Sequence, residues 1–264
     1  MNTESGFIPS GLYSRLDLFW QKWGEVLLPI TSGPYFRLAK KGNETTILQD
    51  LVAATQISGD GLIVEVGCGE SLSPLTTAQL HNQSTVIALD PYSHPLNYYP
   101  DVGERRQSGN CAFFFPLSVT DVNVQTIMKE TAWRVQLVAP EHKPRHKHLL
   151  RLIAAAAELV APGGEMIVTG DGFKSGSREL KRLFDLKTFS PLTESFRLAS
   201  TLKQTFDTFN IYDLRAEDLW RLYGVSGRWF SPVTLTGETR EIWNGRHKPG
   251  IAVLGGKKGG GRVK

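Results

Sequence analysis

Residues 61–72, Gly-Leu-Ile-Val-Glu-Val-Gly-Cys-Gly-Glu-Ser-Leu, decide the fold class of this chain. The apolar stretch around Glu65 predicts a buried strand, and Gly67 and Gly69 follow it in a predicted turn. Because glycine has no Cβ and adopts positive φ angles, such a turn lets a ligand lie against bare backbone. A second apolar stretch, residues 85–89, ends in Asp90, which is placed to bind the two hydroxyls of a ribose. Together the two segments predict a site for a nucleotide-like cofactor.

The spacing of the glycines indicates which cofactor this site takes. A dinucleotide-binding turn has the pattern Gly-x-Gly-x-x-Gly, and here Leu72 stands at the third position. Glu65 and Glu70 would repel a diphosphate and attract a cation. The segment Glu-Val-Gly-Cys-Gly-Glu, with Leu-Asp after the second stretch, resembles the first two motifs of class I S-adenosylmethionine-dependent methyltransferases. That cofactor carries a sulfonium and an ammonium but no phosphate. The resemblance implies a cofactor site made of Glu65, Gly67, Cys68, Gly69 and Asp90.

Strand patterns alternate with helix patterns through the middle of the chain, which is typical of a parallel sheet. We predict strands at residues 62–66, 85–89, 112–117, 134–139 and 165–170, and helices near 72–82, 121–130, 145–161 and 174–186. Pro162-Gly163-Gly164 resembles the turn before the fifth strand of the same family. Residues 230–236 and 250–255 are predicted to be a closing strand pair. The expected fold is therefore α/β: a Rossmann-like class I methyltransferase sheet, mostly parallel with a closing antiparallel pair and helices on both faces.

Residues 1–60 precede this sheet and are predicted to be a helical extension. Ser10 is placed to cap a helix that Pro29 ends, and a second helix is expected at about residues 44–56. The first helix carries apolar residues at helical spacing, namely Leu12, Leu16, Phe19, Trp20, Trp23 and Leu27. The methyltransferase domain would then span residues 61–255, with a substrate-side helical insertion at 173–230. Residues 256–264 are rich in lysine and glycine and are predicted to be a flexible basic tail.

Composition limits the class of protein. The 264 residues are 41% hydrophobic, as in a globular protein, and no apolar run reaches the roughly 18 residues that cross a bilayer. The first residues lack the layout of a secretion signal, so we expect a cytoplasmic protein with no membrane partner. Two cysteines are too few for a disulfide framework. A net charge of +4 is compatible with a polyanionic partner, and nothing in the sequence fixes an oligomeric state.

The best indication of the acceptor follows the predicted strand 134–139, where Pro140-Glu141 precedes a run of cations. The segment resembles that of tRNA (guanine-N7) methyltransferases, which carry Pro-Asp-Pro-Trp and then Lys, Arg, His and Lys. In this chain Glu replaces the Asp, the Trp is absent, and a glycine separates Thr169 from Asp171. The resemblance implies catalytic roles for Glu141, Arg145 and His146, and substrate binding by Lys143, Lys147, Asp171 and Glu241.

Chemistry supports this assignment, and alternatives stay open. Guanine N7 has a lone pair and no proton, so methyl transfer to it needs positioning rather than a general base. Glu141 could accept from the N–H groups of the guanine edge, while the cations bind phosphates of tRNA or another RNA. The cations could equally be a solvated helix start. One alternative is a methyltransferase of a small molecule with a helical lid, and another is a protein that binds the cofactor without transferring methyl.

Two further candidates come from single residues. Asp121 follows the third predicted strand, where related enzymes have an acidic residue that contacts the adenine, but it could equally cap the next helix. Three histidines cluster between residues 142 and 148 without a cysteine or carboxylate at metal-ligand spacing. We therefore expect no metal site.

Overall fold

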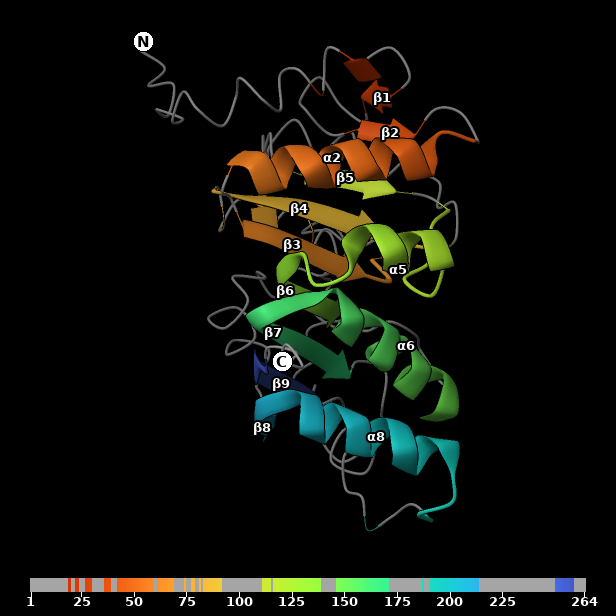
Figure 1. Ribbon diagram of the computed structural model, residues 1–264, viewed down its shortest axis with the longest axis vertical. Coiled ribbons are helices and arrows are strands. Elements are labelled where there is room, and N and C mark those ends of the chain that lie inside the picture. The colour runs from red at the N-terminus through yellow and green to blue at the C-terminus, as the bar shows by residue number, and fades with distance from the viewer. Residues whose placement is uncertain are drawn as a thin grey trace, which may run out of the picture.

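The computed structural model describes residues 19, 22–23, 27–29, 36–38, 42–58, 61–68, 74, 77–78, 81, 83–91, 111–114, 116–138, 146–170, 187, 190–213 and 250–258. These residues form one nine-stranded sheet with the order β1-β2-β5-β4-β3-β6-β7-β9-β8 (Figure 1). The chain leaves β3 toward β4 and β5 on one side and returns to β6 and β7 on the other. The order of the strands thus reverses between β3 and β6, which is where open α/β sheets bind ligands.

The centre of the sheet is parallel, as the sequence predicts. It consists of β3 (Gly61–Val66), β4 (Ser84–Leu89), β5 (Cys111–Phe114), β6 (Ala132–Val138) and β7 (Val160–Gly170). β3 and β4 are paired along their whole length, and every residue of β4 is buried. Continuous apolar runs are typical of strands covered on both faces. β5 ends earlier than the predicted 112–117, because the backbone N–H of Leu117 donates to the carbonyl of Asp90 instead.

The antiparallel closing pair exists, but the strand that pairs with residues 250–255 is not the predicted stretch 230–236. β9 (Gly250–Lys257) lies between β7 and β8 and pairs antiparallel with both. β8 is Phe206–Asp213, directly after helix α8 (Glu194–Thr205), in a stretch for which the sequence suggested irregular helices. Residues 230–236, the predicted partner, lie outside the described residues. The stretch that contains Phe206, Thr208 and Asn210 has no clear strand or helix pattern. Its pairing with β9 makes it a strand.

The predicted turn at Pro162-Gly163-Gly164 is instead an irregularity inside β7. The strand already begins at Val160, and the register with β6 shifts between Ala132 and Arg134. Gly163 has a φ of 80°, and a Cβ on Gly164 would lie 2.7 Å from the carbonyl oxygen of Trp133. Glycines at these two positions therefore allow a bulge where the backbones approach closely.

The N-terminal extension is not wholly helical. Phe19, Lys22 and Trp23 are helical, but Leu27, predicted to lie in the same helix, belongs to β1 (Leu27–Pro29). β1 pairs antiparallel with β2 (Phe36–Leu38), and β2 pairs parallel with β5. Since β1 is the outermost strand, Pro29 is tolerated there. Tertiary pairing at the edge of the sheet therefore overrides the helical pattern.

Two hydrophobic cores cover the two faces of the sheet. The larger core joins the sheet to α2 (Glu44–Ser58), α5 (Val122–Met128), α6 (His146–Leu159) and α8, which all lie over one face (Figure 1). The smaller core lies on the other face and includes Ile63, Val86 and Ala78, of which Ala78 is helical. Helices on both faces are therefore confirmed.

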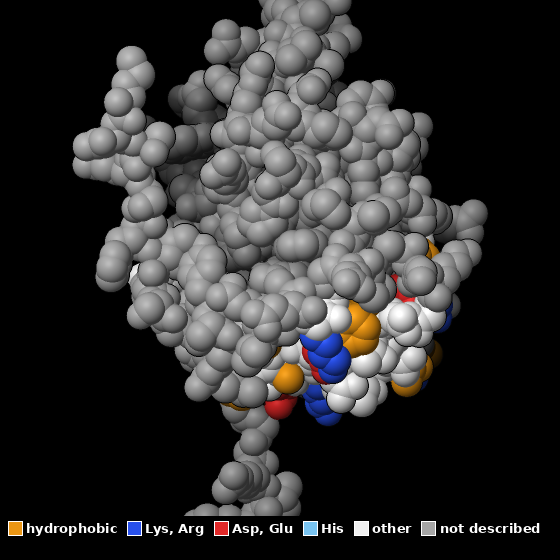
Figure 2. Space-filling view, turned by 90° about the horizontal axis from the view of Figure 1, so that it is seen from above, with side chains coloured by type: hydrophobic (Ala, Val, Ile, Leu, Met, Phe, Trp, Pro, Cys, Tyr) orange, Lys and Arg blue, Asp and Glu red, His pale blue; other side chains and the backbone are white. Residues whose placement is uncertain are grey.

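A charged side chain of α2 binds the helical residues near the start of the described chain. Asp50 of α2 accepts hydrogen bonds from Lys22 Nζ (2.7 Å) and Trp23 Nε1 (2.9 Å). Burial raises the pKa of Asp50. The two hydrogen bonds and the charge of Lys22 together lower this pKa by more than burial raises it, so the net shift is downward. Basic, acidic and hydrophobic side chains lie side by side on the described surface at this end of the molecule (Figure 2).

Lys257, the second residue of the predicted basic tail, belongs to β9, and its side chain is buried. Lys257 Nζ donates to the carbonyl oxygen of Ala157 at 3.0 Å, near the C-terminal end of α6, and lies 3.5 Å from Glu130. Lysine is favourable there because helix C-termini present free carbonyls and negative partial charge. Residues 259–264 lie outside the described residues.

Candidate functional site

The predicted glycine turn and Asp90 come together at the carboxyl ends of the parallel strands. Gly67 follows β3 with a φ of 71°, which glycine adopts without strain. The backbone N–H groups of Gly67 and Cys68 both point to the carbonyl of Leu89, at 2.8 Å and 3.4 Å. Asp90 is the next residue after that carbonyl, and its own N–H donates to Phe114 at 3.3 Å. The turn is thus tied to the end of β4, and the end of β4 to that of β5.

Two carboxylates are buried at this corner. Glu65 is 0% exposed and Asp90 is 4% exposed. Glu65 Oε2 accepts a hydrogen bond of 2.7 Å from Gln136 Nε2 on β6, and the same nitrogen donates to Thr77 Oγ1 at 2.8 Å. Gln136 and Thr77 are themselves 0% exposed. The carboxylate at the end of β3 is therefore held from both the neighbouring strand and the helical segment that follows the turn.

The pKa of Cys68 reflects its burial and the negative charge of the two neighbouring carboxylates. Burial raises the pKa of the Cys68 thiol well above its usual range, and the negative charges of Glu65 and Asp90 raise it further. Burial and the charge of Glu65 likewise raise the pKa of Cys111 on β5. Both cysteines are free and buried. Cys68 is thus a neutral thiol that packs in the turn and not a nucleophile.

Asp121 stands at the same edge, after the loop that leaves β5. It precedes α5 with φ −70° and ψ 133°, but its side chain forms no hydrogen bond with the helix amides. Asp121 Oδ2 instead accepts from the backbone N–H of Ser118 at 2.8 Å, and the side chain is exposed. Asp121 is therefore the N-cap residue of α5, as the second alternative predicts, but its side chain makes no capping hydrogen bond. The predicted adenine contact stays a prediction.

The predicted acceptor site lies mostly outside the described residues. This holds for Gly69 in the cofactor turn and for Glu141, Lys143, Arg145, Asp171 and Glu241. The backbone of His146 and Lys147 begins α6, which starts beyond the carboxyl end of β6 (Figure 1). Arg151, one helical turn further, forms an ion pair of 2.6 Å with Glu194 at the start of α8. Lys147 and Arg151 therefore lie in a helix at the predicted edge of the sheet, and Arg151 binds another helix.

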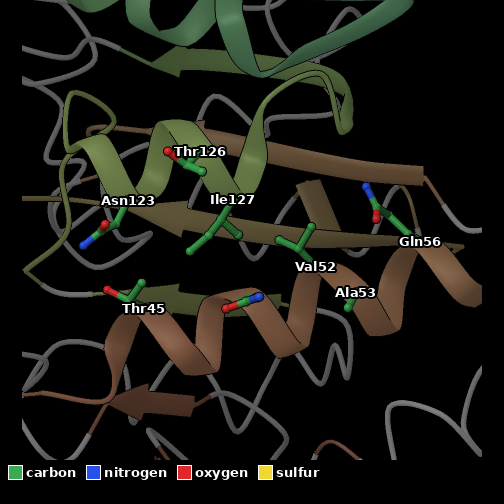
Figure 3. A pocket seen from close by; sticks show the side chains of 8 residues that line it. Thr45, Val52, Ala53, Gln56, Asn123, Thr126 and Ile127 are labelled. Atoms are coloured by element: carbon green, nitrogen blue, oxygen red, sulfur yellow. The ribbon is translucent and has the colours of Figure 1, made fainter.

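A hollow of about 490 Å³ lies elsewhere, between α2 and α5 (Figure 3). Its walls include Thr45, Gln56, Asn123 and Ile127, and none of the described residues that line it is titratable. In the part of the chain that the structure describes, no three His, Cys, Asp or Glu side chains are grouped as a metal site would need. No described helix is long and apolar enough to span a membrane.

Sequence reasoning missed Gln136 and Thr77. The available signal was a polar residue inside the apolar run Val135–Val138, because buried strand positions are seldom polar without a partner. Which partner it meets depends on the register of β3 and β6, where Glu65 lies opposite Gln136. Thr77 lies in a helical segment of the second face, and nothing in the local sequence relates it to Gln136.

No protein-family model and no curated protein sequence matches the chain. Solved structures do match. A variant of the 16S rRNA (adenine(1408)-N(1))-methyltransferase from Catenulisporales acidiphilia has a TM-score of 0.52 and 13% identity, over 88% of this chain and 99% of that one. An antibiotic-related methyltransferase gives a TM-score of 0.48 with 11% identity, over 80% of this chain and 94% of that one. The aminoglycoside resistance methyltransferase NpmB1 gives 0.44 with 18% identity, over 80% of this chain and 93% of that one. The first match shows that the chain shares the fold of that protein.

Proposed function

We propose that the chain is an S-adenosylmethionine-dependent methyltransferase that acts on a base of RNA. The main support for this cofactor is that the buried Glu65 and Asp90 lie beside a glycine turn with positive φ, at the point where the order of the strands reverses. Open α/β sheets bind nucleotide-like ligands at this point. Two buried carboxylates make the corner negative, so it favours a cation and repels a diphosphate.

The described residues suit the parts of this cofactor. Gly67 is half-buried and has no Cβ that would keep a ligand from its backbone, and Asp90 follows the strand end where a ribose would place its hydroxyls. Glu65 lies beneath the turn and supplies negative charge for the ammonium and sulfonium groups. When bound, S-adenosylmethionine supplies the methyl group of its sulfonium. Asp121, exposed at the same edge, is our candidate for the adenine amino group.

The RNA acceptor is supported by chemistry and by likeness of fold. The chain shares the fold of a protein described as a 16S rRNA methyltransferase, and its cation-rich segment enters α6 beside the carboxyl end of β6. Phosphate groups are the natural partners of such a segment. In its finer form the proposal takes guanine N7 as the acceptor atom. Glu141 then accepts from the guanine edge, Arg145 and His146 orient the base, and substrate is held by Lys143, Lys147, Asp171 and Glu241.

Binding of the cofactor is tested first. We expect S-adenosylmethionine to bind the full chain in isothermal titration calorimetry, and Asp90→Ala to weaken binding by roughly tenfold or more, because the ribose loses a charged hydrogen-bond partner. Lys22→Ala, which removes an exposed cation at the N-terminal extension, is the control and should bind as wild type does. Absence of binding to the wild-type chain at millimolar cofactor would refute the proposal.

Identity of the acceptor is tested by transfer of labelled methyl. We expect label to enter bulk RNA rather than a metabolite extract, and mapping of the methylated base decides whether guanine N7 is the acceptor. RNA binding should weaken steeply with salt, since phosphate contacts release counterions. Label found only in small molecules would replace the RNA acceptor by a metabolite. Cofactor binding without transfer to either would indicate a non-methylating binding protein.

A further inference from the structure

We propose that Gln136 is a positioning residue for the cofactor site, which holds the Glu65 carboxylate in place for the cationic part of S-adenosylmethionine. The inference rests on the proposed function and assigns a role to a side chain outside the glycine turn and Asp90. It is carried by the register of the central strands, by two hydrogen bonds and by burial.

Register places the two side chains side by side. In the parallel pairing of β3 with β6, Glu65 and Gln136 are direct partners at the point where the order of the strands reverses. Directly paired residues of neighbouring strands point to the same face of the sheet. Glu65 Oε2 and Gln136 Nε2 are 2.7 Å apart, and neither side chain is exposed. The contact is therefore built into the sheet and does not depend on a surface loop.

A second bond links this pair to the chain beyond the turn. Gln136 Nε2 also donates to Thr77 Oγ1 at 2.8 Å, and Thr77 is helical and buried. Glu65 precedes the turn, and Thr77 follows it. One amide nitrogen thus joins the end of β3 to the helical residue Thr77, so that Gln136 holds the carboxylate and links it to the segment on the second face of the sheet.

The chemistry of the amide suits this role. The orientation of the Gln136 amide follows from its partners, because an ionised carboxylate only accepts hydrogen bonds. Gln136 Oε1 is also buried and has no hydrogen-bond partner within the described residues. A buried acceptor in that state costs about 1–3 kcal/mol. An apolar residue like the neighbouring Val135 and Leu137 would avoid that cost, so we infer that the donor nitrogen is what the site requires.

A neutral donor is what a cationic ligand requires. A lysine or arginine at position 136 would also hold Glu65, but it would cancel the negative charge that attracts the cofactor. An amide holds the carboxylate and adds no charge. Since a hydrogen bond to an ionised carboxylate favours that form, loss of the donor should move the acid limit of cofactor binding toward neutral pH.

The test is Gln136→Met, which keeps the length of the side chain and removes the donor. We expect calorimetry to show roughly tenfold weaker binding of S-adenosylmethionine near neutral pH, the effect of one hydrogen bond to a charged group, and a larger loss in acid. In turnover assays the KM for the cofactor should rise, with little change in kcat. Among the described residues, the other titratable side chains at this corner are Asp90, Cys68 and Cys111, and all three are unchanged in this variant.

The matched control is Thr55→Val. Thr55 is 1% exposed on α2, over the opposite face of the sheet, and its Oγ1 donates to the carbonyl of Leu51 at 2.9 Å. This variant also loses a buried hydrogen bond, so it should unfold at lower temperature while its cofactor affinity and pH profile stay within about twofold of wild type. A purely structural role of Gln136 would make the two variants behave alike.

The possible results distinguish the role of Gln136 from the proposed function. Wild-type affinity and pH profile in Gln136→Met overturn the inference and leave the proposed function intact. Failure of the wild-type chain to bind the cofactor overturns both. Should Gln136→Met not fold, Thr77→Val tests the same arrangement by removing one acceptor of Gln136, and we expect about threefold weaker binding from the loosened amide. Unchanged affinity in Thr77→Val would then count against the inference.

Discussion

Near the amino ends of the parallel strands Arg134 of β6 is paired with Glu165 of β7, whereas at the carboxyl ends Glu65 of β3 accepts from the neutral amide of Gln136. The guanidinium of Arg134 lies 2.6 Å from Glu165 and 4.6 Å from the centre of the Trp133 ring. Lys257, at the same end, is buried against a helix carbonyl and Glu130. At the amino ends of the strands, the edge that we call the amino edge, acidic and basic side chains are thus paired with each other. At the carboxyl ends, the carboxyl edge, Glu65 is held by a neutral amide.

The carboxylates at the two ends of the strands are held by different groups, and this separates stability from binding. An ion pair is locally neutral, so it fastens strands and helices and attracts no ligand. A carboxylate held by an amide keeps its negative charge in a poorly solvated place, where it acts strongly on a nearby cation. We therefore expect substitutions at the carboxyl edge to change cofactor affinity, and matched substitutions at the amino edge to change stability alone.

The largest effect is expected from the glycines. Gly67 at the carboxyl edge and Gly163 at the amino edge both have positive φ, 71° and 80°. Alanine at either position costs about 1–2 kcal/mol of backbone strain. Gly67→Ala also places a methyl group where a ligand would meet backbone, so it should weaken cofactor binding by roughly a hundredfold.

Calorimetry and denaturant unfolding of both variants check this difference. A Cβ on Gly163 would meet no atom within 4 Å, so Gly163→Ala should lose stability and keep wild-type affinity. Equal affinities in the two variants would show that the turn at Gly67 does not contact the cofactor.

A smaller effect is expected when one carboxylate at each edge is neutralised. Glu65→Gln removes the charge beneath the turn and should weaken binding of S-adenosylmethionine by roughly tenfold, with little change in binding of a neutral adenosine analogue. Glu165→Gln breaks the ion pair of Glu165 (31% exposed) with Arg134 (13% exposed). Because the pair is partly exposed, the substitution should lower the free energy of unfolding by at most about 1 kcal/mol and leave cofactor affinity unchanged. Competition binding of the two ligands would contradict the comparison if both weakened equally in Glu65→Gln.

The smallest effect concerns pH at the amino edge. Burial lowers the pKa of His81, the charge of the neighbouring Arg134 lowers it further, and Glu165 partly opposes both. Below about pH 6.5 the unfolded chain therefore binds more protons than the folded protein, and stability falls as the pH drops through this window. Urea unfolding at about pH 5.5 and about pH 7.5 should show less acid loss in His81→Gln than in wild type, by less than about 1 kcal/mol. An unchanged acid loss would remove His81 from the pH response.

Local patterns in the sequence were enough for the central strands and the position of Asp90. The apolar runs of β3 and β4, each ending in a turn or an acid, are continuous in the chain, so the periodicity of neighbouring residues predicts them. β1, β2 and β8 were missed because short or mixed segments become strands only when a partner strand pairs with them. Pro162-Gly163-Gly164 was read as a turn because a bulge uses the same residues.

Neighbouring residues alone predict the α/β alternation, the glycine turn and the acid that follows the second strand, since each depends on residues that are close in the chain. Which side chains meet depends on how the strands pair. The contacts of Gln136 with Glu65 and Thr77 join residues 71 and 59 positions apart, and they exist because β3 and β6 are paired in one register out of several that the apolar pattern allows. Shifting that register by one residue would turn Gln136 to the other face of the sheet and leave Glu65 without this donor.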